Sequence, residues 1–72
     1  MLTENEKLQA IGKSIAKYRK ERKLTQNQLA EILDISREHL AKIETAKRGI
    51  SIGLIFEICK ALKIKEKDLF NF

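Results

Sequence analysis

The chain has 72 residues, 15 of them Lys or Arg and 10 Asp or Glu, which gives a net charge of +5. One Cys and one His supply neither an internal disulfide nor a metal site nor a catalytic centre, so we expect no enzyme and no metal or cofactor. With no Pro, no signal peptide and no apolar run near the ~20 residues of a membrane span, the composition favours a helical, cytoplasmic protein.

The first predicted helix begins after Thr3, which forms a capping box with Glu6. It extends to about Arg22, because apolar residues recur on one face at helical spacing: Leu8, Ile11, Ile15 and Tyr18. Its basic residues are interpreted mainly as a solvated face: Lys13, Lys17, Lys20, Arg22 and Lys23.

The second predicted helix begins at about Gln26, after a second capping box between Thr25 and Gln28. One narrow apolar stripe runs along it, formed by Leu29, Ala30 and Leu33. Asp34 then interrupts the pattern, and Asp tolerates the positive φ that a helix end often needs. We therefore expect this helix to end there.

The third predicted helix follows almost at once, with Ser36 as its N-cap and Ile35 filling the space between the two helices. Leu40 and Ile43 point inward, and the outward positions are Arg37, Glu38, Ala41 and Lys42. A break too short for a loop forces a steep crossing between the two helices. The pattern predicts a helix-turn-helix over residues 25–44, whose second helix can enter the major groove of DNA.

Two more helices are predicted toward the end of the chain. Ser51 caps the first, from Ile52 to Leu62, and its inward stripe is expected to be Ile52, Ile55, Ile58, Cys59 and Leu62. Cys59 is most simply a small core residue, with redox sensing as the alternative. The last helix is expected from Glu66 to Phe70, and residues 47–49 form a basic turn before these helices.

From Ile11 to Phe70 the chain resembles the phage repressor and Cro class of helix-turn-helix DNA-binding domains. The pieces that carry the resemblance are Leu24-Thr25-Gln26, Leu29-Ala30, Ile35-Ser36, Leu40, Lys42-Ile43-Glu44, Lys47-Arg48, Ile58, Ala61-Leu62 and Asp68-Leu69-Phe70. It implies one all-α domain over residues 1–72, a compact five-helix bundle similar to the short stand-alone members, including restriction-modification controller proteins. The sequence departs from the class at Asp34 and Ala46, where Gly is frequent, and at Ile50, where Pro is common.

Base contacts are expected from the exposed face of the third helix. Arg37 suits the O6 and N7 atoms of guanine, and Glu38 can accept from the amino group of cytosine. Lys42 can reach a further guanine or a phosphate. By family likeness Ser36 and His39 are their partners. The alternative is an ordinary solvated helix face.

Other residues are expected to contact the phosphates without reading sequence. Gln26 lies at the N-terminus of the second helix, where free N–H groups favour an anion, and the resemblance implies that it clamps the DNA backbone. Its companions are Asn27, Thr45, Lys47 and Arg48, although Lys47 and Arg48 also fit a solvated turn. Residues 24–50 hold four basic and four acidic groups, so sequence-independent affinity should be modest.

The resemblance also implies a structural ion pair between Arg19 and Glu44. This pair would fix the angle of the recognition helix against the first helix, and removing one partner alone would leave the other desolvated.

The helix from Ile52 to Leu62 carries a wider apolar arc than one core needs, which indicates a second packing partner. We expect a two-fold homodimer that contacts itself through Leu54, Phe56, Ala61, Phe70 and Phe72. Such a dimer requires half-sites about 34 Å apart in an inverted-repeat operator. The alternative is that Phe70 and Phe72 fold back onto the core of the monomer.

Two functions follow. The first is a sequence-specific transcriptional regulator that binds double-stranded DNA and acts by occupying a promoter or contacting RNA polymerase, with no small-molecule ligand. The second is a protein-interaction module or antitoxin that uses the same fold.

Overall fold

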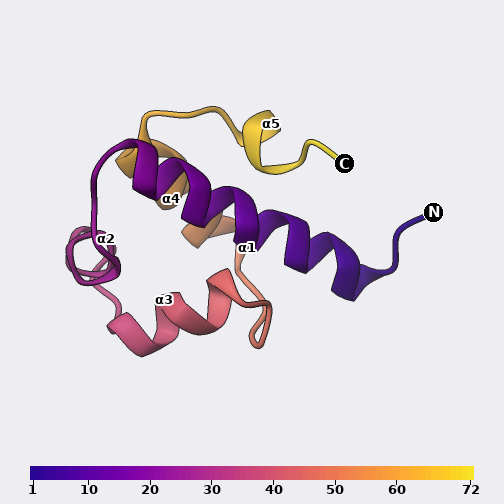
Figure 1. Ribbon diagram of the computed structural model, residues 1–72, viewed down its shortest axis with the longest axis horizontal. Coiled ribbons are helices and arrows are strands. Elements are labelled where there is room, and N and C mark those ends of the chain that lie inside the picture. Colours follow the sequence, from indigo (N-terminus) through magenta and orange to yellow (C-terminus); the bar gives the residue numbers. More distant parts are fainter.

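Five α-helices and no strand make up the computed structural model, which describes residues 1–72 (Figure 1). The helices are α1 (Glu4–Glu21), α2 (Gln26–Leu33), α3 (Arg37–Glu44), α4 (Ile52–Leu62) and α5 (Glu66–Leu69). The all-α class and the number of helices are as predicted. The first and last helices each end one residue earlier than expected. None of the helices has the length and hydropathy that crossing a bilayer requires.

The predicted hydroxyl caps start the four longer helices. Thr3, Thr25, Ser36 and Ser51 each accept a hydrogen bond from the backbone N–H three residues on. Both predicted capping boxes are complete, because Glu6 and Gln28 accept in return from the backbone N–H groups of Thr3 and Thr25, at 2.9 and 2.8 Å. Helix starts are therefore set by local side chains.

Each of the same four helices is followed, within two residues of its last residue, by a left-handed residue that is not glycine. These residues are Lys23, Asp34, Ala46 and Lys63, with φ between 57° and 59°. The next residue's N–H bonds back five residues each time, as Ile35 does to the carbonyl of Ala30 at 3.0 Å. The positive φ predicted at Asp34 is confirmed, and Ala46 takes the same conformation.

The core draws buried apolar side chains from all five helices: Ile11, Ile15, Leu29, Ala30, Leu40, Ile43, Ile55, Ile58, Cys59, Leu62 and Leu69. The prediction that Ile52 belongs to this core is wrong, since Ile52 is 63% exposed. At 3.6 residues per turn Ile52 lies about 70° from the centre of the buried stripe of α4. It is also the first helical residue, so no preceding turn covers it.

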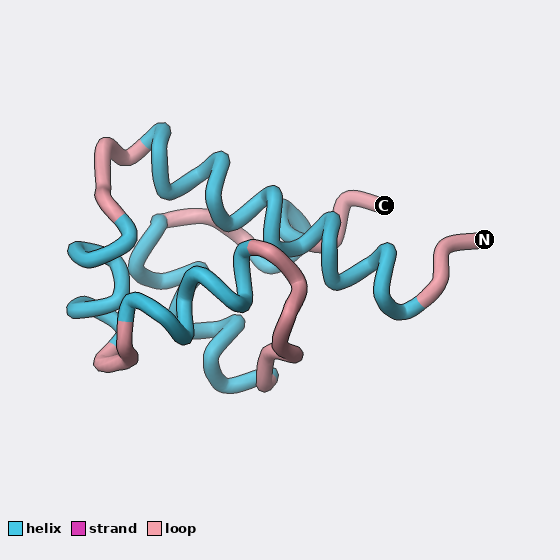
Figure 2. Tube along the Cα trace, turned by 60° about the horizontal axis from the view of Figure 1, so that its bottom comes forward, coloured by secondary structure: helices cyan, strands magenta, loops and turns pink.

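Helix α1 lies between α3 on one side and α5 on the other (Figure 1), and it packs against both. Only residues 34–36 separate α2 from α3, and the turned view in Figure 2 shows a tight turn between the two crossing helices. The end of α1 is joined to the end of α4, because Arg22 donates through Nε to the carbonyl of Leu62 at 2.7 Å. Arg22, expected on a solvated face, thus has a structural role.

Candidate nucleic-acid interface

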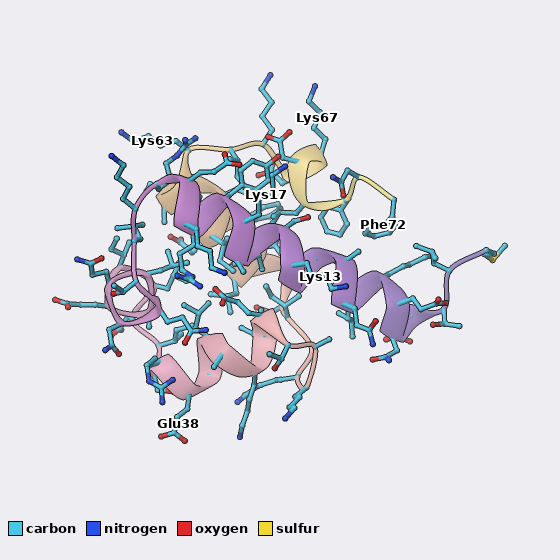
Figure 3. The ribbon with its side chains drawn as sticks, viewed as in Figure 1. Lys13, Lys17, Glu38, Lys63, Lys67 and Phe72 are labelled. Atoms are coloured by element: carbon cyan, nitrogen blue, oxygen red, sulfur yellow. The ribbon has the colours of Figure 1, made fainter.

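The outer face of α3 is open to solvent along its whole length. Arg37, Glu38 and Lys42 are exposed, and their side chains take part in none of the chain's hydrogen bonds or ion pairs. Figure 3 shows Glu38 pointing away from the rest of the molecule, on the side opposite Lys63 and Lys67. With Ala41, Thr45 and Lys47 these side chains line a shallow depression of about 320 Å³. The structure thus brings three of the five predicted base-contacting side chains onto one unobstructed surface, and Ser36 and His39 lie at its edge.

The two hydroxyl residues that flank α3 differ in what they can still bind. The Oγ of Ser36 accepts from the N–H of His39 at 3.0 Å, so its hydroxyl proton remains available as a donor. The Oγ1 of Thr45 donates to the carbonyl of Ala41 at 2.8 Å, so its proton is used within α3. His39 is half-buried at the edge of the exposed face. A phosphate contact from Thr45 would first require that bond to break.

The C-terminal end of α3 is fixed by a buried ion pair. The Nε of Arg19 lies 2.8 Å from the Oε2 of Glu44 and its Nη2 lies 3.2 Å from Oε1. The side chains are 10% and 5% exposed, and this is the chain's one ion pair. Nη1 of Arg19 also donates to the carbonyl of Leu24 at 2.9 Å. The pair that the resemblance implied is therefore formed, and it joins α1 to α3.

Gln26, the predicted phosphate clamp, is tied to this same pair. It is the first residue of α2 and half-buried, and its Nε2 donates to the Oε1 of Glu44 at 2.9 Å. Asn27 beside it is exposed. The sequence did not indicate the contact between Gln26 and Glu44, because the two residues are 18 positions apart. No local sequence motif contains both of them.

Gly12 is a second residue whose role the sequence reading missed. A Cβ at this position would lie 2.6 Å from the carbonyl oxygens of both Ile43 and Glu44, so the backbone of α1 passes directly against the end of α3. A side chain there would displace the recognition helix. The available signal was a glycine in the middle of a strong helical pattern, which often marks a close approach.

Lys47 and Arg48 are exposed in the connection from α3 to α4. They follow the C-terminal end of α3 directly, so they lie next to the depression that Lys47 helps to line. Neither makes an ion pair within the chain. Both side chains are free to meet an anion.

The five residues expected at a dimer interface do not form one surface. Phe56, Phe70 and Phe72 are 54%, 42% and 47% exposed, and the last two pack edge to face with ring centroids 6.1 Å apart. Leu54 and Ala61 are half-buried. Ala61 lies about 140° around α4 from Phe56, where it borders a depression of about 330 Å³ shared with α2.

Cys59 lies in α4, and its side chain is buried in the core. Burial raises the pKa of its thiol, and the carboxylates of Glu66 and Asp68 raise it further. The thiol is therefore protonated at neutral pH and a poor nucleophile, which favours its interpretation as a core residue. No three His, Cys, Asp or Glu side chains lie close enough together to hold a metal ion.

Comparison with known proteins gives one family and several relatives. The family model described as "Helix-turn-helix" matches residues 15–69. The immunity repressor protein of Bacillus phage phi105 is 44% identical over 55 residues, which are 76% of this chain and 38% of that protein. The antitoxin PezA of Streptococcus pneumoniae is 37% identical over 59 residues, 82% of this chain and 37% of PezA. The chain spans less than half the length of these two relatives and of two others, and 83% of a fifth, an uncharacterized HTH-type transcriptional regulator of Methanocaldococcus jannaschii.

Among solved structures, the restriction-modification controller protein C.AhdI from Aeromonas hydrophila superposes with a TM-score of 0.83 at 27% identity. The superposition covers 88% of this chain and 96% of C.AhdI. The likeness thus extends over nearly the whole of both chains.

Proposed function

The chain belongs to the helix-turn-helix family of the phage repressor and Cro type, and from this membership we propose that it is a transcriptional regulator that binds double-stranded DNA by placing α3 in the major groove. The observation that carries the proposal is the outer face of α3, where Arg37, Glu38 and Lys42 are exposed and unpaired. An unpaired, mixed-charge face of this kind on the second helix of the motif suits base edges.

Each side chain of this face has a chemical counterpart in the groove. Arg37 can donate two parallel hydrogen bonds to the O6 and N7 of guanine, a contact worth ~1–3 kcal/mol against a wrong base. Glu38 can accept from the amino group of cytosine, and its charge keeps it away from phosphates. Lys42 meets a further guanine or a phosphate. Ser36 and His39 contribute from the edge of the face.

Phosphate contacts are proposed on both sides of α3. Gln26 and Asn27 lie at the N-terminus of α2, where unsatisfied N–H groups favour an anion. Lys47 and Arg48 are exposed just beyond the other end of α3. Thr45 is the weakest member of this group, because its hydroxyl proton is bonded within the helix.

Two substitutions test the division between base and phosphate contacts. The probe is the duplex that the unaltered protein enriches from a random-sequence pool. We expect Arg37→Ala to relax base preference at one position, and Lys47→Ala to weaken binding to all sequences and to lower the salt slope by about one. Lys67→Ala is the matched control, since Lys67 points to the opposite side of the molecule (Figure 3). If both test variants bind as the unaltered protein does at moderate salt, the assigned surface is wrong.

We further propose that the chain binds an inverted-repeat operator as a two-fold homodimer. Support comes from the aromatic rings of Phe56, Phe70 and Phe72, which stay about half exposed in the monomer although Phe70 and Phe72 pack against each other, because large exposed apolar surfaces often mark an interface. Sedimentation equilibrium tests the proposal: Phe56→Ser should shift the protein toward monomer, whereas Ile32→Ser, which removes an equally exposed apolar side chain from α2, should not. An unaltered protein that remains monomeric at high micromolar concentration would contradict it.

An antitoxin or other protein-interaction module is the second candidate. It is favoured by the 37% identity with the antitoxin PezA and by the same exposed aromatic rings. A gel shift with the DNA upstream of the protein's own gene separates the candidates. Specific binding that Arg37→Ala weakens supports the regulator, and the absence of any shift supports the interaction module.

A further inference from the structure

The carboxylate of Glu44 accepts three hydrogen bonds from two different helices. Two come from Arg19 of α1, at 2.8 and 3.2 Å, and the third comes from Nε2 of Gln26 of α2, at 2.9 Å. Glu44 itself ends α3. The predicted phosphate clamp and the chain's one buried ion pair are therefore parts of a single network.

We infer that Glu44 is a positioning residue that orients the amide of Gln26 toward a phosphate of bound DNA, an inference that rests on the DNA-binding function proposed above. The ion pair thereby has a second role besides fixing α3 against α1. It sets which atoms of Gln26 face the solvent at the start of α2.

The chemistry of the amide explains why a carboxylate suits this role. A glutamine side chain presents two N–H donors at one end and a carbonyl oxygen at the other. An ionised carboxylate can only accept, so the end that faces Glu44 must be the nitrogen. One N–H then bonds Glu44 and the second N–H remains free to donate. A phosphate also only accepts, so it needs that free N–H and would be repelled by the carbonyl oxygen.

The buried charges make the arrangement compatible with DNA. A free carboxylate near the phosphates would repel them, but the guanidinium of Arg19 neutralises Glu44 at 2.8 Å. Arg19 is held in turn by the carbonyl of Leu24, and the close approach of Gly12 fixes the backbone of Glu44. Gln26 is the most exposed of the three side chains. The network therefore ends in a single neutral donor at the surface.

A double-mutant cycle tests whether Glu44 acts through Gln26. The probe is again the duplex enriched by the unaltered protein, measured at a temperature where every variant is folded. We expect Gln26→Ala to lower affinity about tenfold, the factor for one hydrogen bond to a charged group. In a background with Arg19→Met and Glu44→Leu, which removes both buried charges and so preserves the fold, Gln26→Ala should change affinity less than twofold.

The background variant itself gives a second readout. If Glu44 served only to fix α3 against α1, any loss of affinity in the Arg19→Met, Glu44→Leu variant would leave the full effect of Gln26→Ala in that background. If it positions Gln26, that variant loses about tenfold in affinity, as Gln26→Ala does. Gln9→Ala, at an exposed glutamine of α1, is the control and should change nothing.

NMR provides a test that uses only the unaltered protein and so does not depend on any variant being folded. The side-chain amide protons of Gln26 should exchange with solvent more slowly than those of Gln9. Equal exchange for the two amides, or an equal loss from Gln26→Ala in both backgrounds, overturns the inference.

The experiments distinguish a failure of this inference from a failure of the proposed DNA-binding function. If Gln26→Ala is without effect while Arg37→Ala weakens binding, this inference is wrong and the DNA-binding proposal stands. If neither affects binding, the DNA-binding surface itself is misassigned and the inference is overturned with it.

Discussion

The two sides of α3 differ in almost every physical respect, although they belong to one helix of eight residues. On the outer side Arg37, Glu38 and Lys42 are exposed and have no partner in the chain. On the inner side Leu40, Ile43 and Glu44 are buried. An isolated helix this short is unstable in water. The inner side therefore supplies both the stability and the orientation of α3, whereas the residues of the outer side have no role in holding the fold together.

The largest effect should come from breaking the ion pair on the inner side. We expect Arg19→Met to lower the free energy of unfolding by about 3–5 kcal/mol, because it leaves Glu44 charged and buried. The second substitution Glu44→Leu should recover much of that loss, since it removes the unpaired charge. Urea denaturation of the three proteins measures both changes. A double variant less stable than the Arg19→Met protein would show that the pair stabilises more than its desolvation costs.

The contact at Gly12 should give the next largest effect. We expect Gly12→Ala to destabilise the protein by about 1–3 kcal/mol, the range for overpacking, because the added methyl group would lie 2.6 Å from two carbonyl oxygens. Gly53→Ala in α4 is the matched control. No atom lies within 4 Å of its Cβ position, so it should stabilise the helix by about 0.5–1 kcal/mol. Thermal or urea unfolding that shifts both variants in the same direction would contradict this interpretation.

A smaller effect, and of opposite sign, is expected where α3 ends. Ala46 has a φ of 59°, a conformation that costs an L-residue roughly 1–2 kcal/mol and glycine almost nothing. Replacing Ala46 by Gly would remove this cost, but the greater conformational freedom of glycine in the unfolded chain offsets part of the stabilisation. Ala46→Gly should therefore stabilise the protein by about 0.5–1 kcal/mol, measured by urea denaturation, without changing DNA affinity. A loss of stability would mean that the methyl group of Ala46 packs more tightly than its half-buried state indicates.

The features that could be predicted from the sequence are those carried by neighbouring residues. The hydroxyl caps at Thr3, Thr25, Ser36 and Ser51, and the positive φ at Asp34, depend on residues within one helical turn. Periodicity also separated the buried Leu40 and Ile43 from the exposed residues of α3. These signals were sufficient for the helix-turn-helix and for the exposed side of its second helix.

The contacts between distant residues could not be predicted in this way. Gln26 and Glu44 are 18 positions apart, and Arg22 reaches the carbonyl of Leu62 across 40 positions. No local pattern identifies such partners, because they meet only when the helices pack. The pairing of Arg19 with Glu44 came from the family resemblance rather than from spacing. The prediction for Ile52 failed for a related reason. Periodicity indicates which side of a helix a residue lies on, but not whether other elements cover that position.

The left-handed residues after α1 and α2 affect whether the helix-turn-helix segment could fold as an isolated peptide. Lys23 and Asp34 hold a backbone geometry that their side chains disfavour, and the residue after each, Leu24 and Ile35, packs against the core. The rest of the bundle thus compensates for both turns. A synthetic peptide of residues 23–45 would lack that compensation and should be largely unstructured by circular dichroism. Grafting this segment alone onto another scaffold would transfer its amino-acid sequence but not its helix-turn-helix conformation.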